Sequence, residues 1–559
     1  MTETAYLPEP ACPARPVAED QRKTRWLWVG ILVLAASVPY ISTLGYGFVY
    51  DDGPQIVENR DLLSLKSVPG YFTHAITKAV GFHGGGLPVF YRPLFFLQLF
   101  LTRMLFGPGP FGFHLVSLLF HAGNTLLVYC IARRLGVRPG AGQLAGLLFA
   151  VHPVHVECVV WPSASPDLMV LGAILLSVLA FINVQRTIAT RARYRWLAAS
   201  LTAFLAALLV KETALVTVPL VAVIAFLETA SGDSRVRRVM VALAPYFGLT
   251  LFYFLVRKHI LNGLVATVTP IPLREMARTW PNILWFYERH LVIPTRVSLL
   301  YDYDLVEHAT LWAFWIPLAA VLASLALFGV WAWRHRSPAV AMATCLVVLP
   351  VILVLNFRLF NWRDLVHDRY LYTPSAGFCI LAAMALWELG SWSAKTIRPP
   401  VQRALAAGLL CFLALTTVTQ AMPWRSNLLL LGHAVEVAPG NVASEMLLGN
   451  EFEGRGNFEE ANICYRRVVQ LTPAWGPAWF AYGRTLLLTQ DPNHAVRSLQ
   501  HSVALDESPI AFVWLALALD QVGRQQEAEA MLARAAAHDP SMLQVHARIQ
   551  QNLLVARKN

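Results

Sequence analysis

The sequence contains few charged residues for its length. Only 14% of its 559 residues are Asp, Glu, Lys or Arg, and 56% are hydrophobic, whereas about 25% of an average soluble domain is charged. A chain of this length could form three or four soluble domains, but their surfaces would need more charge than the sequence holds. Together with a mean hydropathy of +0.50, this composition predicts a protein that is largely embedded in a membrane.

Cysteine is also scarce, with seven residues scattered singly and no Cys-x-x-Cys pair. This spacing predicts neither a disulfide framework nor a zinc site. The first 422 residues hold 34 basic and 21 acidic residues, whereas the segment from Pro423 to the end holds 11 and 13. A basic excess in a membrane region usually lies in cytoplasmic loops, so we expect no nucleic-acid partner. The change in composition predicts a domain boundary near Met422.

Apolar stretches divide the region 26–422 into eleven predicted membrane-spanning helices. An apolar helix of about 20 residues crosses the ~30 Å hydrocarbon core of a bilayer. The predicted spans are residues 26–44, 111–132, 141–161, 168–184, 196–210, 213–227, 239–256, 311–333, 338–357, 370–387 and 401–421. The fifth and sixth have only 15 residues each, so the number of spans depends most on these two.

Basic residues in short loops predict the orientation. They gather in alternate connections, within residues 133–138, 186–195, 235–238, 334–336 and 395–403. Short loops rich in Lys and Arg are typical of the cytoplasmic face. We therefore expect a cytoplasmic segment 1–25, long outer loops 45–110 and 257–310, and an extracytoplasmic C-terminal domain on a protein of the cytoplasmic (inner) membrane.

The C-terminal segment, residues 423–559, repeats at an interval of 34 residues. Three pairs of residues share this interval: Gly449 and Gly483, Ala461 and Ala495, and Pro439 and Pro473. The interval is that of the tetratricopeptide helix–turn–helix unit, in which small residues let paired helices approach closely. We predict an α-solenoid with repeats at about 441–474, 475–508 and 509–541. Such a solenoid binds a peptide or another protein; the alternative is a rigid spacer or a dimerisation surface.

Two adjacent carboxylates, Asp51 and Asp52, closely follow the first predicted span. Like charges this close raise the pKa of one carboxyl, which suits a general base near neutral pH. The alternative is an ordinary solvated turn or a helix cap. The loop 45–110 favours a function, because structureless loops beyond about 12–15 residues are seldom plain connectors.

Further ionisable residues gather at the predicted outer ends of the spans, where such groups are costly and usually functional. They are Arg92, His152, His155, Glu157, Asp167, Lys211, Glu212, His367, Asp368 and Arg369. For the two histidines in positions 152 and 155, the alternative is a polar pair bonded to neighbouring helices. Their spacing differs from the HExxH motif, so a zinc protease is not predicted.

The order of these motifs resembles a known family. FVYDD (48–52), YRP (91–93), FAVHPVHVE (149–157), KE (211–212) and DRYLYTPS (368–375) follow one another as in the transmembrane and tetratricopeptide-repeat O-mannosyltransferases and their bacterial relatives. These enzymes are in the GT-C class of glycosyltransferases. The resemblance spans the membrane region and the repeats, nearly the whole chain.

The resemblance implies an all-α fold, with a GT-C-type transmembrane bundle followed by the solenoid. It implies inverting transfer of a sugar from a polyprenyl-phosphate donor to an acceptor hydroxyl at the outer face. The best-known relatives transfer mannose, although no residue here reads sugar stereochemistry. We expect a protein or peptide acceptor held by the repeats, contacts with membrane lipids, and neither a metal nor another cofactor.

The same resemblance assigns roles to the polar residues. Asp51 or Asp52 is the expected catalytic base, and Lys211, Arg369 and Arg92 are the expected cations for the donor phosphate. The supporting residues are His152, His155, Glu157, Asp167, Glu212, His367 and Asp368. The family often has an arginine where this chain has Ser165. If that arginine binds the donor, the resemblance implies either impaired activity here or a transfer of its role to Arg363 or Arg369. The alternative function is a catalytically silent membrane scaffold that recruits proteins through its repeats.

Overall fold

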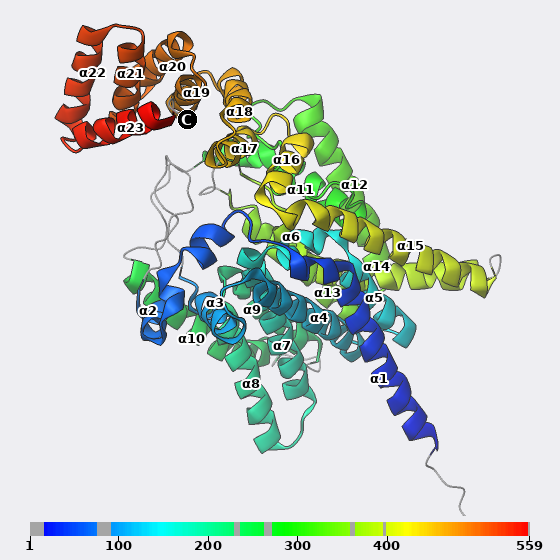
Figure 1. Cartoon of the computed structure of the whole chain (residues 1–559). Coiled ribbons are helices and arrows are strands. Elements are labelled where there is room, and N and C mark those ends of the chain that lie inside the picture. Colours follow the sequence, from blue (N-terminus) through cyan, green and yellow to red (C-terminus); the bar gives the residue numbers. More distant parts are fainter. Residues whose placement is uncertain are drawn as a thin grey trace, which may run out of the picture.

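Helices form every regular element in the described parts of the chain (Figure 1). The structure is a computed structural model, and it describes residues 16–74, 91–228, 235–261, 271–357, 364–394 and 398–556. Most of the predicted segment 1–25, parts of the outer loops (75–90 and 262–270), and the candidate residue Arg363 lie outside the described residues. An all-α fold, as predicted, is confirmed for these ranges.

Seven of the helices in these ranges are long and apolar enough to cross a membrane. They are Thr24–Gly45, Pro110–Arg134, Pro162–Arg186, Arg235–Leu261, Leu311–Arg334, Asp368–Ser393 and Pro399–Arg425. The bent pair Pro139–Val151 and Pro153–Val160 would make an eighth crossing. The three other predicted spans, 196–210, 213–227 and 338–357, are mostly helical but fall short of this test. The protein is thus a multi-pass membrane protein, and the number eleven stays a prediction.

The α-helices of this region are α1 (Pro16–Ser37), α2 (Val68–Thr73), α3 (Pro93–Phe106), α4 (Pro110–Arg134), α5 (Pro139–Val151), α6 (Val156–Val160), α7 (Ser165–Arg186), α8 (Thr190–Leu208), α9 (Thr217–Leu227), α10 (Arg235–Leu261), α11 (Leu273–Val292), α12 (Ile316–Arg334), α13 (Pro338–Val354), α14 (Tyr372–Ser393) and α15 (Pro399–Ala421). Short 3₁₀ and π turns join them: η1 (Val38–Gly45), η2 (Gly53–Val57), η3 (Arg60–Leu63), η4 (Leu65–Ser67), η5 (Pro153–His155), η6 (Pro162–Ala164), η7 (Glu212–Val216), η8 (Leu311–Trp315), η10 (Asp368–Leu371) and η11 (Met422–Arg425).

Helix α7 lies at the centre of the membrane core. It packs against α4, α8 and α9, while α14 packs against α5 and α13. Leu171, Ile174 and Val178 of α7 are buried, as expected for a helix that is apolar on all sides. In contrast, α12 leaves Leu322 and Leu327 exposed, and an exposed apolar helix face is typical of a surface that contacts lipid or protein.

Two prolines shape the end of this core that contains Glu157 and Ser163. Proline lacks the amide that a helix interior requires and disfavours helical backbone in the residue before it. Accordingly, α5 ends at Val151, His152 is extended before Pro153, and the chain bends by 48° into the segment that contains α6. Trp161 is extended before Pro162 in the same way. These two breaks place short turns, not continuous helix, around Glu157 and Ser163.

The C-terminal helices follow one another in antiparallel pairs, and α18 to α23 lie at the upper left of Figure 1. They are α16 (Asn427–Val437), α17 (Val442–Gly454), α18 (Phe458–Leu471), α19 (Gly476–Leu488), α20 (Pro492–Leu505), α21 (Pro509–Gln521), α22 (Gln525–His538) and α23 (Met542–Ala556). A Cβ atom on Gly449 would lie 2.6 Å from the Tyr465 ring, and one on Gly483 would lie 2.7 Å from Leu499. Glycine therefore allows the close approach within each pair, while the assignment as tetratricopeptide repeats stays a prediction.

An extended segment, residues 293–310, follows α11 in the chain and contacts the first of these C-terminal helices. Its Tyr301 carbonyl accepts a hydrogen bond from the Asn441 side chain at 2.8 Å, and the Asp302 carboxylate accepts one from the Gly440 amide at 3.0 Å. His433 of α16 is bonded to the Val297 carbonyl at 3.1 Å. The start of the C-terminal helices is thus fixed to the membrane core through this segment.

Candidate active site

Asp52 anchors the turn that follows the first span. Its carboxylate is fully buried and accepts three hydrogen bonds: from the Val49 amide at 3.1 Å, the Ser163 amide at 3.0 Å and the Ser163 hydroxyl at 2.6 Å. These bonds join the turn to the loop before α7. A carboxylate occupied in this way is well suited to hold the turn in place.

Asp51, in contrast, is only partly buried. The Gln55 side-chain amide donates to its carboxylate at 3.3 Å, and the charges of Arg369, Asp364 and His367 act on its pKa. Burial raises the pKa of Asp51 to about 6, although Arg369 acts to lower it. Burial also raises the pKa of Asp52 to about 7, against the effect of its hydrogen bonds. Repulsion between Asp51 and Asp52, the cause expected from the sequence, contributes little to these raised pKa values, because burial is the largest cause for both carboxyls.

Arg369 is held by Glu157, which comes from the short helix after the proline break. The guanidinium donates to the Glu157 carboxylate at 2.6 Å, and the Arg369 amide donates to the other oxygen at 2.8 Å. Glu157 is completely buried, whereas the Arg369 side chain remains 19% exposed. The guanidinium lies 5.4 Å from the ring centre of Trp161 and 5.3 Å from that of Tyr370.

Lys211 forms the second cationic group of the site. Its ammonium donates to the Asp167 carboxylate at 2.6 Å, and it lies 5.7 Å from the centre of the Tyr370 ring. Lys211 and Arg369 therefore face one aromatic ring from two different connections of the bundle. Each cation keeps a partly exposed side chain, so an anion at this ring could be reached by both.

Glu212, Arg92 and Arg257 form a second charged group beside this site, and Arg257 was not selected from the sequence. Arg257, near the end of α10, makes an ion pair with Glu212, and Arg92 is a further positive charge near that carboxylate. The Leu94 amide donates to the Leu209 carbonyl at 3.2 Å, which fixes the start of α3 beside α8. Glu212 thus pairs with Arg257 and not with the adjacent Lys211.

Three other predicted residues connect helices. His152 is bonded to the Leu291 carbonyl at 3.0 Å and His155 to the Ser375 hydroxyl at 2.7 Å. Asp368 is buried and accepts hydrogen bonds from the Tyr301 hydroxyl and the Ser298 amide. It therefore holds the extended segment 293–310 through Tyr301 and Ser298.

His367 lies between two carboxylates. One ring nitrogen is 3.6 Å from Glu157, and the other is 2.9 Å from Asp364. Glu157 also binds Arg369, and the charge of Asp364 acts on Asp51. His367 is therefore part of one charged network with Arg369 and Asp51. Ser165, at the position where the family resemblance predicts an arginine, donates its hydroxyl to Gln98 at 3.1 Å.

Several residues of this site were missed by sequence reasoning. They are Trp161, Ser163, Asp364, Tyr370 and Arg257. Tyr370 lies within the DRYLYTPS motif, and Asp364 lies three residues before His367. Their position close to selected ionisable residues was the sequence signal that could have identified both. Ser163 and Trp161 gave no chemical signal, because their roles depend on contacts with residues about 110 positions away.

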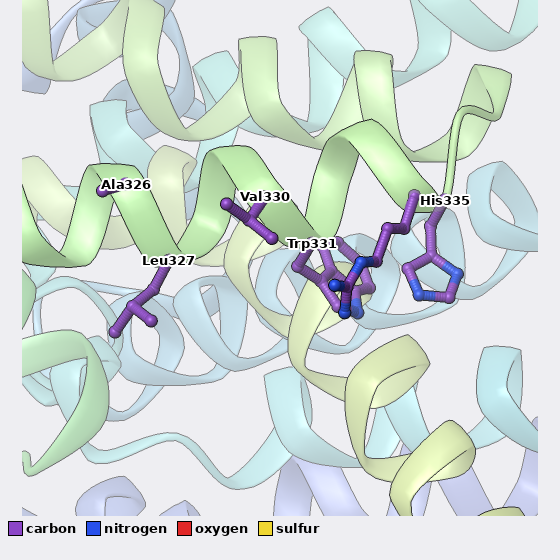
Figure 2. A pocket seen from close by; sticks show the side chains of 6 residues that line it. Ala326, Leu327, Val330, Trp331 and His335 are labelled. Carbon is purple, nitrogen blue, oxygen red and sulfur yellow. The ribbon is translucent and has the colours of Figure 1, made fainter.

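The described residues contain no group of three or more His, Cys, Asp or Glu side chains placed to hold a metal ion. The expected independence from metals and other cofactors stays a prediction. A pocket along α12 is shown in Figure 2. It is lined by Ala326, Leu327, Val330, Trp331, Arg334 and His335, none of which is among the residues of the site described above.

Known proteins similar in sequence to this chain include mannosyltransferases. Residues 91–256, which include Arg92, Glu157 and Lys211, match the family Dolichyl-phosphate-mannose-protein mannosyltransferase. The chain resembles the protein O-mannosyl-transferases. Protein O-mannosyl-transferase TMTC3 of Mus musculus is 25% identical over 508 residues, covering 82% of this chain and 52% of that protein. Tmtc2 of Drosophila melanogaster is 35% identical over 222 residues, covering 38% and 23%. The predicted family resemblance is confirmed.

The chain spans about half the length of the first of these relatives. Among solved structures, ArnT from Cupriavidus metallidurans bound to undecaprenyl phosphate is 15% identical and covers 92% of this chain and 88% of that one. The TM-score of this match is 0.40, which is too low to define the fold or the site of this chain.

Proposed function

We propose that this chain is an integral-membrane glycosyltransferase that transfers a sugar from a polyprenyl-phosphate donor to a hydroxyl of a protein acceptor. The similarity to protein O-mannosyl-transferases supports mannose as the sugar. The observation that carries the proposal is the placement of a partly buried carboxylate, Asp51, among the charges around Arg369, while Arg369 and Lys211 share the Tyr370 ring.

The two cations have the chemistry that a lipid phosphate needs. Arg369 and Lys211 would bind the donor phosphate through charge-assisted hydrogen bonds and stabilise it as the leaving group. Each already has a carboxylate partner, Glu157 or Asp167, which fixes its side chain before the donor arrives. Arg92 and Arg257, near Glu212, would add positive potential on the Lys211 side.

Asp51 is the group best placed to act as the base. Its carboxylate would accept the proton of the acceptor hydroxyl as the hydroxyl oxygen attacks the anomeric carbon of the sugar. The bond from that carbon to the phosphate oxygen breaks, and polyprenyl phosphate leaves on the opposite side, so that the configuration inverts. A raised pKa near 6 keeps Asp51 ionised at neutral pH while making it a better proton acceptor than an ordinary aspartate.

The remaining parts of the proposal concern the surroundings of the site. Eleven spans with a cytoplasmic N-terminus would place Asp51 and helices α16–α23 at the extracytoplasmic face of the cytoplasmic membrane. Helices α17–α22 would be tetratricopeptide repeats that present the protein acceptor. The reaction as proposed uses no metal, because the cations of the chain act on the phosphate.

The test is a transfer assay in membranes with a radiolabelled polyprenyl-phosphate mannose and an acceptor peptide library. We expect Asp51→Asn to lower transfer at least ~100-fold, as loss of a positioned base does, with donor binding unchanged. Asp491→Asn is the matched control, because Asp491 caps α20 by accepting from the His494 amide and Asn caps equally well. Full activity of Asp51→Asn would refute this base. A wild type that transfers no sugar from polyprenyl-phosphate hexoses would favour the scaffold.

A further inference from the structure

The backbone directly before Asp51 has an unusual conformation. Tyr50 has a φ angle of +51°, and Gln490 is the other non-glycine residue with positive φ in the described ranges. A bulky side chain rarely adopts the left-handed region, and such residues persist only where the surrounding structure holds them. Gln490 lies in the turn after α19, whereas Tyr50 determines where the Asp51 carboxylate points.

One hydrogen bond to the Tyr50 amide comes from a residue distant in the sequence. The Tyr50 amide donates to the Asn427 side-chain oxygen at 2.7 Å, across 377 positions. Two contacts from the same segment support it. The Gly47 amide donates to the Arg425 carbonyl at 3.4 Å, and Trp424 packs on Trp161, whose ring in turn contacts the Tyr50 ring.

Asn427 is the first residue of α16. The preceding Ser426 occupies the N-cap position, where a side chain commonly accepts first-turn amides. The Asn427 side-chain oxygen accepts from the Tyr50 amide. The hydrogen bond therefore joins the helix that begins the C-terminal region to the turn that presents Asp51.

We propose that Asn427 is a positioning residue that holds Tyr50 in the left-handed conformation and so aims Asp51 at the acceptor hydroxyl. This inference rests on the proposed function for its catalytic consequence. The Asp52 bonds to Val49 and Ser163 anchor the two sides of this turn, whereas the Asn427 bond acts on the Tyr50 amide itself. Loss of the Asn427 bond would let the Tyr50 backbone shift toward negative φ and change the direction of the Asp51 carboxylate. The segment after the last span is then a working part of the site, although it contributes no group to the chemistry.

The kinetic test compares Asn427→Ala, Asn427→Asp and the control Asn183→Ala, whose native side-chain oxygen accepts a hydrogen bond from Arg134 near the end of α7 opposite Asp167. At pH 8, we expect Asn427→Ala to lower kcat at least ~10-fold with the donor KM within about twofold, as for loss of an interaction that matters in the transition state. Asn427→Asp keeps an acceptor oxygen and should retain most of kcat. Equal kcat for Asn427→Ala and wild type would refute the inference.

A double variant tests whether Asn427 acts through Tyr50. Glycine adopts positive φ without steric cost, so in a Tyr50→Gly background the Asn427→Ala change should lower kcat by less than about threefold, well below its effect in wild type. Full additivity of the two changes would contradict the route through the Tyr50 backbone.

A labelling experiment separates this inference from the proposed function. Asp51→Cys is prepared with and without Asn427→Ala, and alkylation at position 51 by a charged maleimide is followed by peptide mass spectrometry in folded, detergent-solubilised protein. We expect at least ~5-fold faster alkylation in the Asn427→Ala background, because opening of the turn exposes the position. Unchanged alkylation would refute the positioning role, whether or not wild type transfers sugar. Absence of transfer with faster alkylation would refute only the proposed function.

Discussion

The ion pair between Arg369 and Glu157 allows stability and catalysis to be separated. Glu157 is completely buried, and its carboxylate accepts from the Arg369 side chain at 2.6 Å and from the Arg369 amide at 2.8 Å. Removing one partner of a buried pair leaves an uncompensated charge, which costs ~3–5 kcal/mol. We therefore expect Arg369→Met to lower the free energy of unfolding by about that amount. The double variant Arg369→Met/Glu157→Gln should recover most of it, because both charges are then absent.

Transfer activity should behave differently. Arg369 is also a proposed ligand of the donor phosphate, so Arg369→Met and the double variant should both lose transfer by at least ~100-fold. Unfolding is measured by equilibrium denaturation in mixed micelles, and transfer by the labelled-donor assay on the same preparations. A double variant that is both stable and fully active would refute the role of Arg369 at the phosphate. An Arg369→Met protein as stable as wild type would refute the buried pair.

Three further outcomes are expected. Because the pKa of Asp51 is raised to about 6 and the ionised form is active, kcat/KM should rise ~10-fold between pH 5 and pH 7 and level off above; a flat profile would contradict Asp51 as the base. Lys211→Met should raise the donor KM ~10-fold or more, and an unchanged KM would remove Lys211 from the donor site. Gly449→Val should destabilise the C-terminal helices by ~1–3 kcal/mol, because the new side chain clashes with Tyr465. Gly454→Ala, with open space around it, should not destabilise them. Limited proteolysis of the C-terminal helices measures the difference between the two variants.

The helices were predictable because their signal is local. Apolar runs depend on residues close together in the sequence, and the 34-residue interval can be read directly from regular spacing. Each of the eleven predicted spans lies in helical structure for most of its length. The number of crossings was not predictable in the same way. The run 196–210 is the apolar end of a helix that begins among arginines, and the runs 213–227 and 338–357 correspond to helices of 11 and 17 residues.

The site was predictable as a set of residue types but not as a set of contacts. Motif order pointed to Asp51, Asp52, Lys211 and Arg369, but it left the two carboxylates equivalent. Their difference arises from Ser163, which binds Asp52 across 111 positions. Such pairings are set by tertiary packing, which no local pattern encodes. The same holds for the partners of His152 and His155, which connect helices within the bundle.

The central claim is that Lys211 and Arg369 hold a lipid phosphate beside Asp51. A structure of the full chain with a polyprenyl-phosphate sugar bound tests it most directly. We expect density for the phosphate over the Tyr370 ring, within hydrogen-bonding distance, about 2.7–2.9 Å, of both cations, with the sugar directed toward Asp51. A phosphate bound away from these cations, or a sugar out of reach of the Asp51 carboxylate, would contradict the proposed site.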